Sequence, residues 1–365
     1  MRIGFDARYI RWDEHDGISR FSVGLVSELA NLVSNEGGDE LVIFVSDERQ
    51  LALLPAVPHF MVSAPTSARE PWVAKQINRA ECDIVFSPMQ TMGSRGRTYK
   101  LILTVHDLIY YRHRTPPRQF SLPVRLLWRL YHLSWWPQRY LLNRADAVVT
   151  VSEVTARLIQ KRRLTRHPVF VVPNAADAPS DSRPQPWRSR GKRALYMGSF
   201  MPYKNVDTLA RAAAVKTDWE FHLLSKCDSH TQDRLRLLAG GGHLIFHDGT
   251  PEKQYRDLLS TSLALITASR DEGFGIPLIE AMSQGTPLVV SDIDIFHEVA
   301  GEAAVFVSPD DPQGFAQALG ELAGESYWSR ASSAGLERSR AYSWEQSARL
   351  LFDVLKQTVH ARSVR

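Results

Sequence analysis

The residues best placed for chemistry lie in one stretch, Ser269–Ser291, in the second half of the chain. It contains Gly273 and Gly275 and then Pro277, ahead of an apolar run of helical character. Glycines let the backbone approach a ligand closely, and the free N–H groups of a helix start attract a negative charge. Proline suits the first helical position, because its missing N–H loses no hydrogen bond there. The stretch predicts a strand-to-helix turn that binds phosphate.

Two carboxylates bracket this turn, Glu272 before it and Glu280 about one turn inside the helix. A carboxylate repels phosphate, so both acids are expected to accept hydrogen bonds from the hydroxyls of a ribose or a sugar ring. The alternative is that Glu272 only caps the helix and Glu280 is a solvated surface charge. For one glutamate alone that alternative would be favoured, but the glycines, the proline and both acids at one strand end favour a ligand site.

A second loop, Gly198–Asn205, follows the first strand of the same half and leads into a predicted helix over 206–214. The first strand-to-helix turn of a doubly wound sheet commonly binds phosphate, and Lys204 could place a positive charge on a diphosphate. Taken alone, Lys204 is equally well interpreted as an exposed loop lysine. Both loops leave the carboxyl ends of strands, where ligands bind in such folds.

In the first half, His106 and Asp107 follow an apolar strand over Leu101–Val105. A histidine there could polarise or hydrogen-bond a substrate near neutral pH, and the aspartate could orient the loop. A lone histidine is more often a satisfied structural residue. Near the amino terminus, Asp16–Arg20 predicts another glycine turn into a helix, suited to phosphate or to an acceptor hydroxyl. The residues of that turn are Gly17, Ile18 and Arg20.

The segment Arg112–Arg144 carries seven arginines and no acidic residue. At helical spacing it places apolar and aromatic side chains on one side and basic ones on another. The first set is Val124, Leu127, Trp128, Tyr131 and Trp135, and the second is Arg125, Arg129, His132 and Arg139. A basic amphipathic helix with tryptophans is typical of a segment that lies in an anionic membrane interface. An equally good interpretation is a helix that packs on the core while its arginines extend to solvent.

A metal site is not expected. Asp292 and Asp294 could bind a divalent ion together with nucleotide phosphates, but so short a match is weak, and Asp294 also suits a helix cap. The sequence contains no P-loop, no GxSxG and no HExxH. We therefore expect neither a metal ion nor a cofactor.

The composition is that of an ordinary globular chain of 365 residues, 44% hydrophobic and 23% charged, which excludes collagen-like, disulfide-scaffold and wholly disordered classes. The net charge is +4, and residues 1–183 carry the basic excess, which suits a phosphate-rich or membrane-surface partner better than nucleic acid. Cys82 and Cys227 cannot build a disulfide framework. With a strand-like start and no apolar stretch of spanning length, these features predict a cytoplasmic protein, peripheral on the inner face of the cytoplasmic membrane.

Short apolar runs alternate with helical patterns, which is typical of βα units and parallel sheets. The strands predicted in the first half are Arg2–Asp6, Leu41–Val45, Asp83–Phe86, Leu101–Val105, Ala147–Val151 and Val169–Val172, with a helix over Ile18–Leu32. Those in the second half are Ala194–Gly198, Glu220–Leu224, His243–His247, Leu263–Ala268, Pro287–Ser291 and Ala304–Val307. The α/β chain is thus expected to form domains over 1–180 and 194–343, joined by a proline-, serine- and arginine-rich linker over 181–193. A terminal helix over 344–365 could return to the first domain.

The chain resembles a known family. The stretch Glu272–Glu280 is similar to the E-x7-E motif of retaining GT-B glycosyltransferases, glycosyltransferase family 4 (group 1). The overall resemblance is to the mannosyltransferase members of that family. Further agreement follows in order at Gly17–Arg20, Val105–Leu108, Val151–Glu153, Pro173–Asn174, Gly198–Asn205 and Glu298–Ala304. One departure is Tyr203, where the family often has an arginine before the lysine. A second cation for a diphosphate must then come from elsewhere.

The resemblance implies a GT-B fold, two Rossmann-like doubly wound parallel-sheet domains facing a central cleft. The first domain would bind the acceptor and the second the nucleotide-sugar donor. By the same resemblance Glu280 would hold the donor ribose, Lys204 would neutralise the diphosphate, and His106 would contact the donor sugar near the reacting carbon. The implied catalytic residues are His106, Glu272 and Lys204. The implied donor-binding residues are Gly198, Ser199, Lys204, Asn205, Glu272, Gly273, Phe274, Gly275, Ile276 and Glu280, and the acceptor or phosphate loop is Gly17, Ile18, Arg20 and Asp107.

The activity implied is retaining, metal-independent transfer of a hexose to a lipid-linked or saccharide acceptor in polysaccharide or glycolipid biosynthesis. Mannose from GDP-mannose is the first expectation, and UDP-sugars stay open. Two other classes also stay open: a nucleotide-sugar epimerase or phosphorylase of the same architecture, and a non-catalytic nucleotide-sugar-binding subunit. An epimerase needs no acceptor, so analysis of the products separates it from a transferase.

Overall fold

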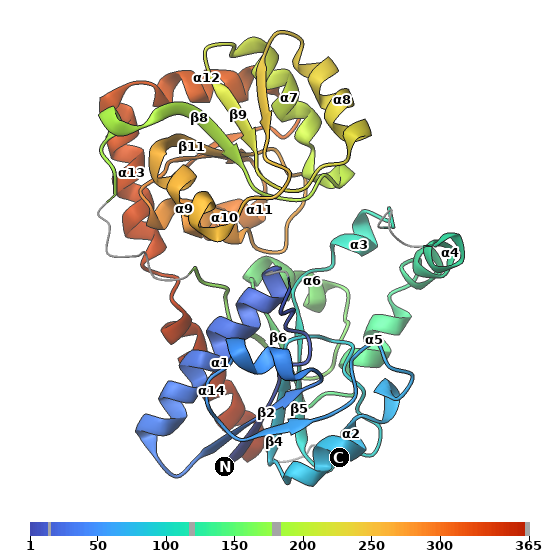
Figure 1. The fold of residues 1–365 in the computed structure, drawn as a ribbon. Coiled ribbons are helices and arrows are strands. Elements are labelled where there is room, and N and C mark those ends of the chain that lie inside the picture. Colours follow the sequence, from blue (N-terminus) through green and yellow to red (C-terminus); the bar gives the residue numbers. More distant parts are fainter. Residues whose placement is uncertain (14–15, 117–120, 177–183, 362–365) are drawn as a thin grey trace. The chain divides into compact units, whose positions relative to one another are not determined.

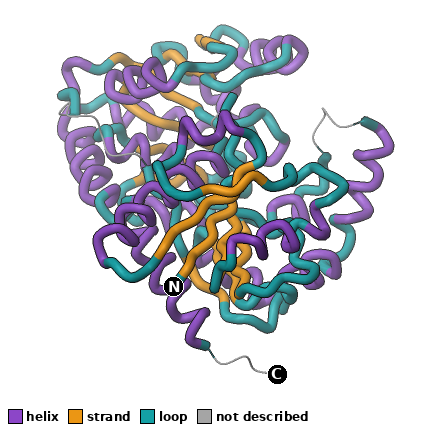
Figure 2. Tube along the Cα trace, turned by 60° about the horizontal axis from the view of Figure 1, so that its bottom comes forward, coloured by secondary structure: helices purple, strands orange, loops and turns teal. Residues whose placement is uncertain are grey.

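The computed structural model describes residues 1–13, 16–116, 121–176 and 184–361. The chain forms two compact units (Figure 1). The first comprises residues 1–114, 122–177 and 342–365, and the second is built mainly from residues 178–341. Each unit is a parallel sheet with helices on both faces, as Figure 2 shows.

The first unit contains a seven-stranded sheet in the order β3-β2-β1-β4-β5-β6-β7. Its strands are β1 (Arg2–Asp6), β2 (Glu40–Val45), β3 (His59–Met61), β4 (Ile84–Ser87), β5 (Lys100–Val105), β6 (Ala147–Thr150) and β7 (Val169–Val171). The central strands are near-continuous apolar runs because helices cover both of their faces. Strand β3 was not predicted from the sequence, since it is a three-residue edge strand in which His59 and Met61 are exposed.

The helices of the first unit include two long ones that pack against each other, α1 and α14. The full set is α1 (Gly17–Glu36), α2 (Ala74–Ile77), α3 (Ile109–Arg112), α4 (Leu122–Tyr131), α5 (Trp136–Leu142), α6 (Glu153–Lys161) and α14 (Trp344–His360). The Trp344 ring lies so close to Gly24 of α1 that a Cβ there would be 2.4 Å from it. The Ser347 hydroxyl donates to the Pro173 carbonyl at 2.8 Å. The carboxyl-terminal helix is therefore part of the first unit, although almost the whole second unit precedes it in sequence.

The second unit contains a six-stranded sheet in the order β10-β9-β8-β11-β12-β13. Its strands are β8 (Gly191–Tyr196), β9 (Glu220–Leu223), β10 (His243–Phe246), β11 (Ser262–Thr267), β12 (Leu288–Ser291) and β13 (Ala304–Val307). Its helices are α7 (Val206–Val215), α8 (Ser229–Ala239), α9 (Glu252–Thr261), α10 (Ile276–Ser283), α11 (Asp294–Ala300), α12 (Pro312–Leu322) and α13 (Glu325–Ser339). The strand order reverses between β8 and β11, as it does between β1 and β4 in the first unit. Ligands bind at such a reversal in open α/β sheets.

The end of the predicted linker is part of the second unit. Residues 177–183 lie outside the described residues, but Gly191–Arg193 already belong to β8. Arg190 is buried, and its guanidinium donates to the carbonyls of Leu259, Ser262 and Gln284. A buried charge needs such partners, because it has lost its hydration. The composition that suggests a linker is therefore misleading at this arginine, which fixes the start of β8 to the rest of the unit.

The basic segment forms two short helices, α4 and α5, and its predicted faces are wrong. Val124 and Leu127, on the predicted apolar side, are 47% and 68% exposed, so the interpretation in which this side packs on the core does not hold for them. His132, expected on the basic side, is buried, and its Nδ1–H donates to the Trp128 carbonyl at 2.8 Å. The turn between α4 and α5 breaks the helical period on which the expectation depended.

Candidate active site

The predicted strand-to-helix turn lies between β11 and α10. Gly275 has a φ of 101°, which other residues rarely adopt, and a Cβ there would lie 3.2 Å from the Phe296 ring. Helix α10 begins at Ile276, so Pro277 takes the second helical position and not the first. The cap residue Gly275 makes no side-chain hydrogen bond to the helix, which leaves the first N–H groups of α10 able to bind an anion.

Lys204 and Glu272 are in direct contact within the second unit. The Lys204 Nζ lies 2.5 Å from Glu272 Oε1, and the Ser269 hydroxyl donates to the same oxygen at 2.9 Å. The lysine and glutamate side chains are only 15% and 14% exposed. They meet because the loops that carry them leave β8 and β11, the two strands at the reversal of the sheet. The alternatives of an exposed loop lysine and a capping glutamate are therefore wrong.

Glu280 lies on α10 and is hydrogen-bonded from a neighbouring helix. The Tyr255 hydroxyl of α9 donates to Glu280 Oε2 at 2.7 Å, and the tyrosine itself is buried. A fixed tyrosine holds the carboxylate in one orientation, so Glu280 is not a freely solvated surface charge. The sequence reasoning missed both Tyr255 and Ser269. Tyr255 lies on α9, a separate helix whose sequence carries no sign of a contact with Glu280. Ser269 is a loop serine, and serines are common in loops.

The loop after β8 is held by its own side chains. The Tyr196 hydroxyl donates to the Ser199 carbonyl at 2.6 Å, and a Cβ on Gly198 would lie 2.8 Å from that hydroxyl. Burial, and then the charge of Glu272, raises the pKa of Tyr196 well above its ordinary value of 10.0, so the hydroxyl keeps its proton. Asn205 is buried and donates to the Pro309 carbonyl at 2.7 Å. Its amide therefore positions the start of α7.

Arg270 lies beside this loop, at the place where Tyr203 replaces the family's arginine. The Arg270 backbone N–H donates to the Tyr203 carbonyl at 2.8 Å, and its guanidinium donates to the Pro202 carbonyl and to Asp310. Of the other implied donor residues, Ser199 is exposed, Phe274 is buried, and Gly273 and Ile276 are partly buried. Arg270 is thus a cation next to the Gly198–Asn205 loop that was not predicted from the sequence.

His106 follows β5 in the first unit. Its Nε2 lies 2.8 Å from the Pro88 carbonyl, and its ring meets the Phe21 ring edge-on at 5.0 Å. Burial lowers the pKa of His106 below its ordinary value of 6.5, so the imidazole is neutral at pH 7. A neutral imidazole that donates from Nε2 to a carbonyl has Nδ1 as an acceptor. The next residue, Asp107, accepts the Ile109 N–H at 3.0 Å and orients the loop, as predicted.

The glycine turn near the amino terminus is a capped helix start. Asp16 accepts the Ser19 N–H at 2.8 Å, and α1 begins at Gly17. The Ser19 hydroxyl in turn accepts the Arg11 N–H at 2.9 Å. Ile18 and Arg20, in the first turn of α1, are partly buried. The carboxylate of Asp16 already satisfies one of the N–H groups that was expected to bind phosphate.

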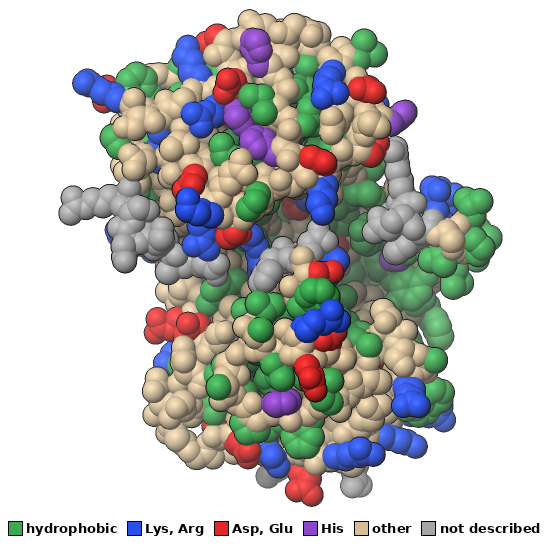
Figure 3. All heavy atoms as spheres, in the orientation of Figure 1, with side chains coloured by type: hydrophobic (Ala, Val, Ile, Leu, Met, Phe, Trp, Pro, Cys, Tyr) green, Lys and Arg blue, Asp and Glu red, His purple; other side chains and the backbone are tan. Residues whose placement is uncertain are grey.

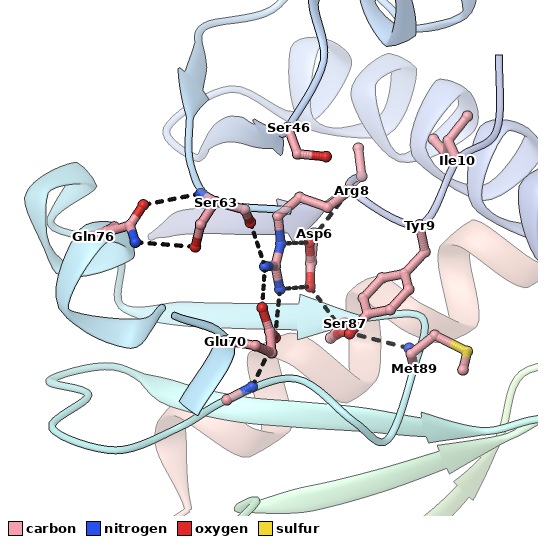
Figure 4. Close-up of polar contacts among 12 residues, drawn as sticks. Asp6, Arg8, Tyr9, Ile10, Ser46, Ser63, Glu70, Gln76, Ser87 and Met89 are labelled. Carbon is pink, nitrogen blue, oxygen red and sulfur yellow. Dashed lines mark hydrogen bonds and ion pairs between the residues drawn. The ribbon is translucent and has the colours of Figure 1, made fainter. Parts of the chain in front are cut away.

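A buried ion-pair network at the carboxyl end of β1 was not predicted (Figure 4). Arg8 Nε lies 2.7 Å from Asp6 Oδ1, and Arg8 Nη1 lies 2.6 Å from Glu70 Oε2. Burial alone would lower the pKa of Arg8, but the two carboxylates raise it above its ordinary value. The only sequence signal was an acid and an arginine at the end of an apolar strand. The network fixes the loop after β1, beside a cavity of about 470 Å³ that Tyr9 and Trp12 help to line.

Within the described residues, no group of three histidine, cysteine or acidic side chains is placed to hold a metal ion. Asp292 instead lies 2.6 Å from His297 Nε2. Asp294 is the first residue of α11, and the cap residue before it is Ile293, so the expected capping role of Asp294 is wrong. The described helices also include none that is long and apolar enough to span a membrane.

Solved structures with the same arrangement define the class of fold. A sucrose-phosphate synthase from Thermosynechococcus elongatus matches with a TM-score of 0.71 at 18% identity, over 98% of each chain. The Anabaena protein HepE, in complex with UDP and glucose, matches with a TM-score of 0.68 at 16% identity, over 97% of this chain and 99% of that one. The chain therefore has the GT-B fold, with one Rossmann-like parallel sheet in each unit.

Sequence comparison identifies the family. The model for Glycosyltransferase Family 4 matches residues 17–178, and that for glycosyl transferases group 1 matches residues 191–325. The chain belongs to this glycosyltransferase family.

Two curated relatives are mannosyltransferases. The O-antigen chain mannosyltransferase RfbU of Salmonella typhimurium is 29% identical over 60% of this chain. An MMP alpha-(1->4)-mannosyltransferase of Mycolicibacterium hassiacum is 26% identical over 61% of it. These matches span 59% and 56% of the relatives' own lengths.

Proposed function

We propose that this protein is a retaining glycosyltransferase that moves mannose from GDP-mannose to a lipid-linked or saccharide acceptor. The observation that carries the proposal is the partly buried pair of Lys204 and Glu272 beside the uncapped start of α10. A cation and helix N–H groups at one sheet reversal fit a diphosphate, and a carboxylate beside them fits sugar hydroxyls.

The reaction needs stabilisation of negative charge. Breaking the bond between the sugar and the diphosphate develops charge on the leaving oxygen, and fixed donors aimed at that oxygen lower the barrier most. Lys204 and the N–H groups of α10 supply these donors without a metal ion. Arg270, next to the same loop, is the second cation that Tyr203 does not provide. Neutral His106 would accept a hydrogen bond from a hydroxyl of the donor sugar.

The proposed sugar rests on the relatives. Mannose is proposed because the curated relatives at 26–29% identity are named mannosyltransferases, one of them of the O-antigen chain. That relationship also supports an acceptor in polysaccharide or glycolipid assembly. UDP-glucose is the second candidate donor, because the similar HepE structure contains UDP and glucose. Glu280, held by Tyr255, would bind the ribose of either nucleotide.

A thermal-shift screen with GDP-mannose, UDP-glucose and ADP-glucose tests the donor. We expect GDP-mannose to raise the Tm most, since a ligand that binds only the folded state stabilises it. Incubation with radiolabelled donor then tests the reaction. Label in a new saccharide or lipid supports transfer, and an isomerised nucleotide sugar without acceptor would show an epimerase. Tight binding with no turnover over a broad acceptor panel would instead show a binding subunit.

A further inference from the structure

The exposed apolar side chains of the described residues are concentrated in one place. Eight large ones lie between residues 122 and 140, and elsewhere they are scattered singly or nearly so. The eight are Leu122, Val124, Leu126, Leu127, Leu130, Leu133, Trp136 and Tyr140, which we call the α4–α5 apolar face. Figure 3 shows hydrophobic side chains gathered at the position of α4 in Figure 1.

Three of the exposed leucines lie along one side of α4. Leu122, Leu126 and Leu130 follow one another at four-residue steps, so they form one stripe along the helix. They are 77%, 60% and 55% exposed. Trp136 and Tyr140 form a similar exposed pair on α5, with stacked rings 5.7 Å apart. The stripe and the ring pair each present exposed apolar surface.

Packing within the unit does not use this face. On the other side of α4, the Trp128 and His132 rings lie 4.0 Å apart and the Trp128 ring meets the Tyr110 ring at 5.0 Å. The Trp135 ring stacks on the Tyr111 ring at 4.1 Å. These ring contacts hold α4 and the turn after it against the unit. Trp128 and Trp135, predicted from the sequence to meet a membrane, therefore point inward. The leucines of α4 are the side chains that remain exposed.

The charge around the face is of one sign. Residues 112–144 contain seven arginines and no acidic residue. Arg125 lies on the partly buried side of α4 and Arg129 at the edge of the leucine stripe, and neither makes an ion pair with a described residue. Arg139, by contrast, donates to the carbonyls of Arg162 and Arg163 and fixes α5. A surface of leucine, tryptophan and tyrosine with unpaired arginines at its edge complements an anionic, apolar partner.

We propose that the α4–α5 apolar face binds the surface of a bilayer that contains anionic phospholipid. The leucines enter the boundary between headgroups and acyl chains, the rings of Trp136 and Tyr140 lie at headgroup depth, and Arg125 and Arg129 contact lipid phosphates. The inference extends the proposed function without depending on it, because the contact uses no donor or acceptor residue.

Flotation with vesicles of equal parts phosphatidylcholine and phosphatidylglycerol tests the proposal, with no nucleotide sugar present. We expect the protein to float with these vesicles and not with pure phosphatidylcholine. The double variant Leu126→Glu, Leu130→Glu should bind at least about tenfold more weakly, since charge at an inserted position opposes burial. Arg125→Gln with Arg129→Gln should lose the preference for anionic lipid.

The matched control is Leu237→Glu, which places the same charge at an 82% exposed leucine of α8 in the second unit. It should float like the unaltered protein. An unchanged circular-dichroism spectrum shows that the variants fold. The proposal is overturned if the unaltered protein does not bind the anionic vesicles, or if the double glutamate variant binds them equally well. It is also overturned if sedimentation without vesicles shows a dimer that this variant abolishes, because the face would then bind a second copy. If the unaltered protein binds the anionic vesicles but shows no transferase activity, only the proposed function is refuted.

Discussion

The Lys204 Nζ and the Glu272 Oε1 lie 2.5 Å apart in a site from which most water is excluded, so each charge is neutralised by the other. A diphosphate that binds Lys204 must compete with Glu272, and the released carboxylate can then accept hydrogen bonds from sugar hydroxyls. In the proposed function, the pair would therefore couple recognition of the diphosphate to recognition of the sugar.

Replacing Lys204 tests this coupling. Lys204→Met should lower kcat by about a hundredfold to a thousandfold, because a donor aimed at the leaving oxygen is lost. Steady-state transfer with a labelled donor measures it. The matched control is Lys216→Met, a change at another partly buried, ion-paired lysine of the second unit. Equal losses in both variants would remove Lys204 from the chemistry.

Glu280 is predicted to bind the nucleotide. Glu280→Ala should weaken binding of the bare nucleoside diphosphate by roughly tenfold to a hundredfold, since hydrogen bonds to a charged group contribute about 1.5–3 kcal/mol. Tyr255→Phe keeps the carboxylate but removes the 2.7 Å hydrogen bond that orients it, so it should have a smaller effect. Calorimetry measures both. Unchanged affinity in Glu280→Ala would contradict the ribose assignment.

Arg190 is predicted to stabilise the second unit. Arg190→Met leaves the buried carbonyls of Leu259, Ser262 and Gln284 without this donor, which should cost about 3 kcal/mol of unfolding free energy. Burial lowers the pKa of Arg190 to about 10, so the wild-type guanidinium stays charged at pH 7. Denaturant unfolding measures the change. Arg188→Met, at an exposed arginine two residues earlier, should change stability little.

Gly24 is predicted to be required where α14 packs on α1. Gly24→Ala places a Cβ within 2.4 Å of the Trp344 ring, and overpacking of this kind costs about 1–3 kcal/mol. The expected result is a lower Tm in thermal unfolding. Gly241→Ala is the control, because a Cβ at Gly241 meets no atom within 4 Å. If both variants melt alike, the contact of Trp344 with α1 contributes little.

Acid should destabilise the protein before its carboxylates titrate. Burial lowers the pKa of His106, His132 and His222 below the ordinary value of 6.5. The unfolded chain therefore binds more protons than the folded chain just below pH 6.5, so stability is full above that pH and falls as the pH drops toward the lowered values. Denaturant midpoints from about pH 7.5 to about pH 5.5 measure this. His106→Gln should make the dependence less steep, and a flat profile in the unaltered protein would refute the prediction.

Local patterns predicted much of the two sheets. Strands such as β5 are recognisable because helices bury both faces and leave only apolar residues in the run. The turn before α10 was recognisable because Gly275 needs a positive φ and proline suits a helix start. The predictions failed where an element is too short to show a repeating pattern, as at the three-residue edge strand β3. They also failed where a turn interrupts the helical pattern, as between α4 and α5.

Contacts between distant segments could not be predicted in this way. The sequence determined which residue types were available, namely glycines and acids in one turn, a lysine in one loop and arginines in one basic segment. Only the tertiary structure decided that Lys204 meets Glu272, that Tyr255 holds Glu280, and that the leucines of α4 face outward while Trp135 faces inward. The reason is physical: local backbone preferences act over a few residues, whereas these contacts depend on which strands become neighbours and which face of a helix is buried.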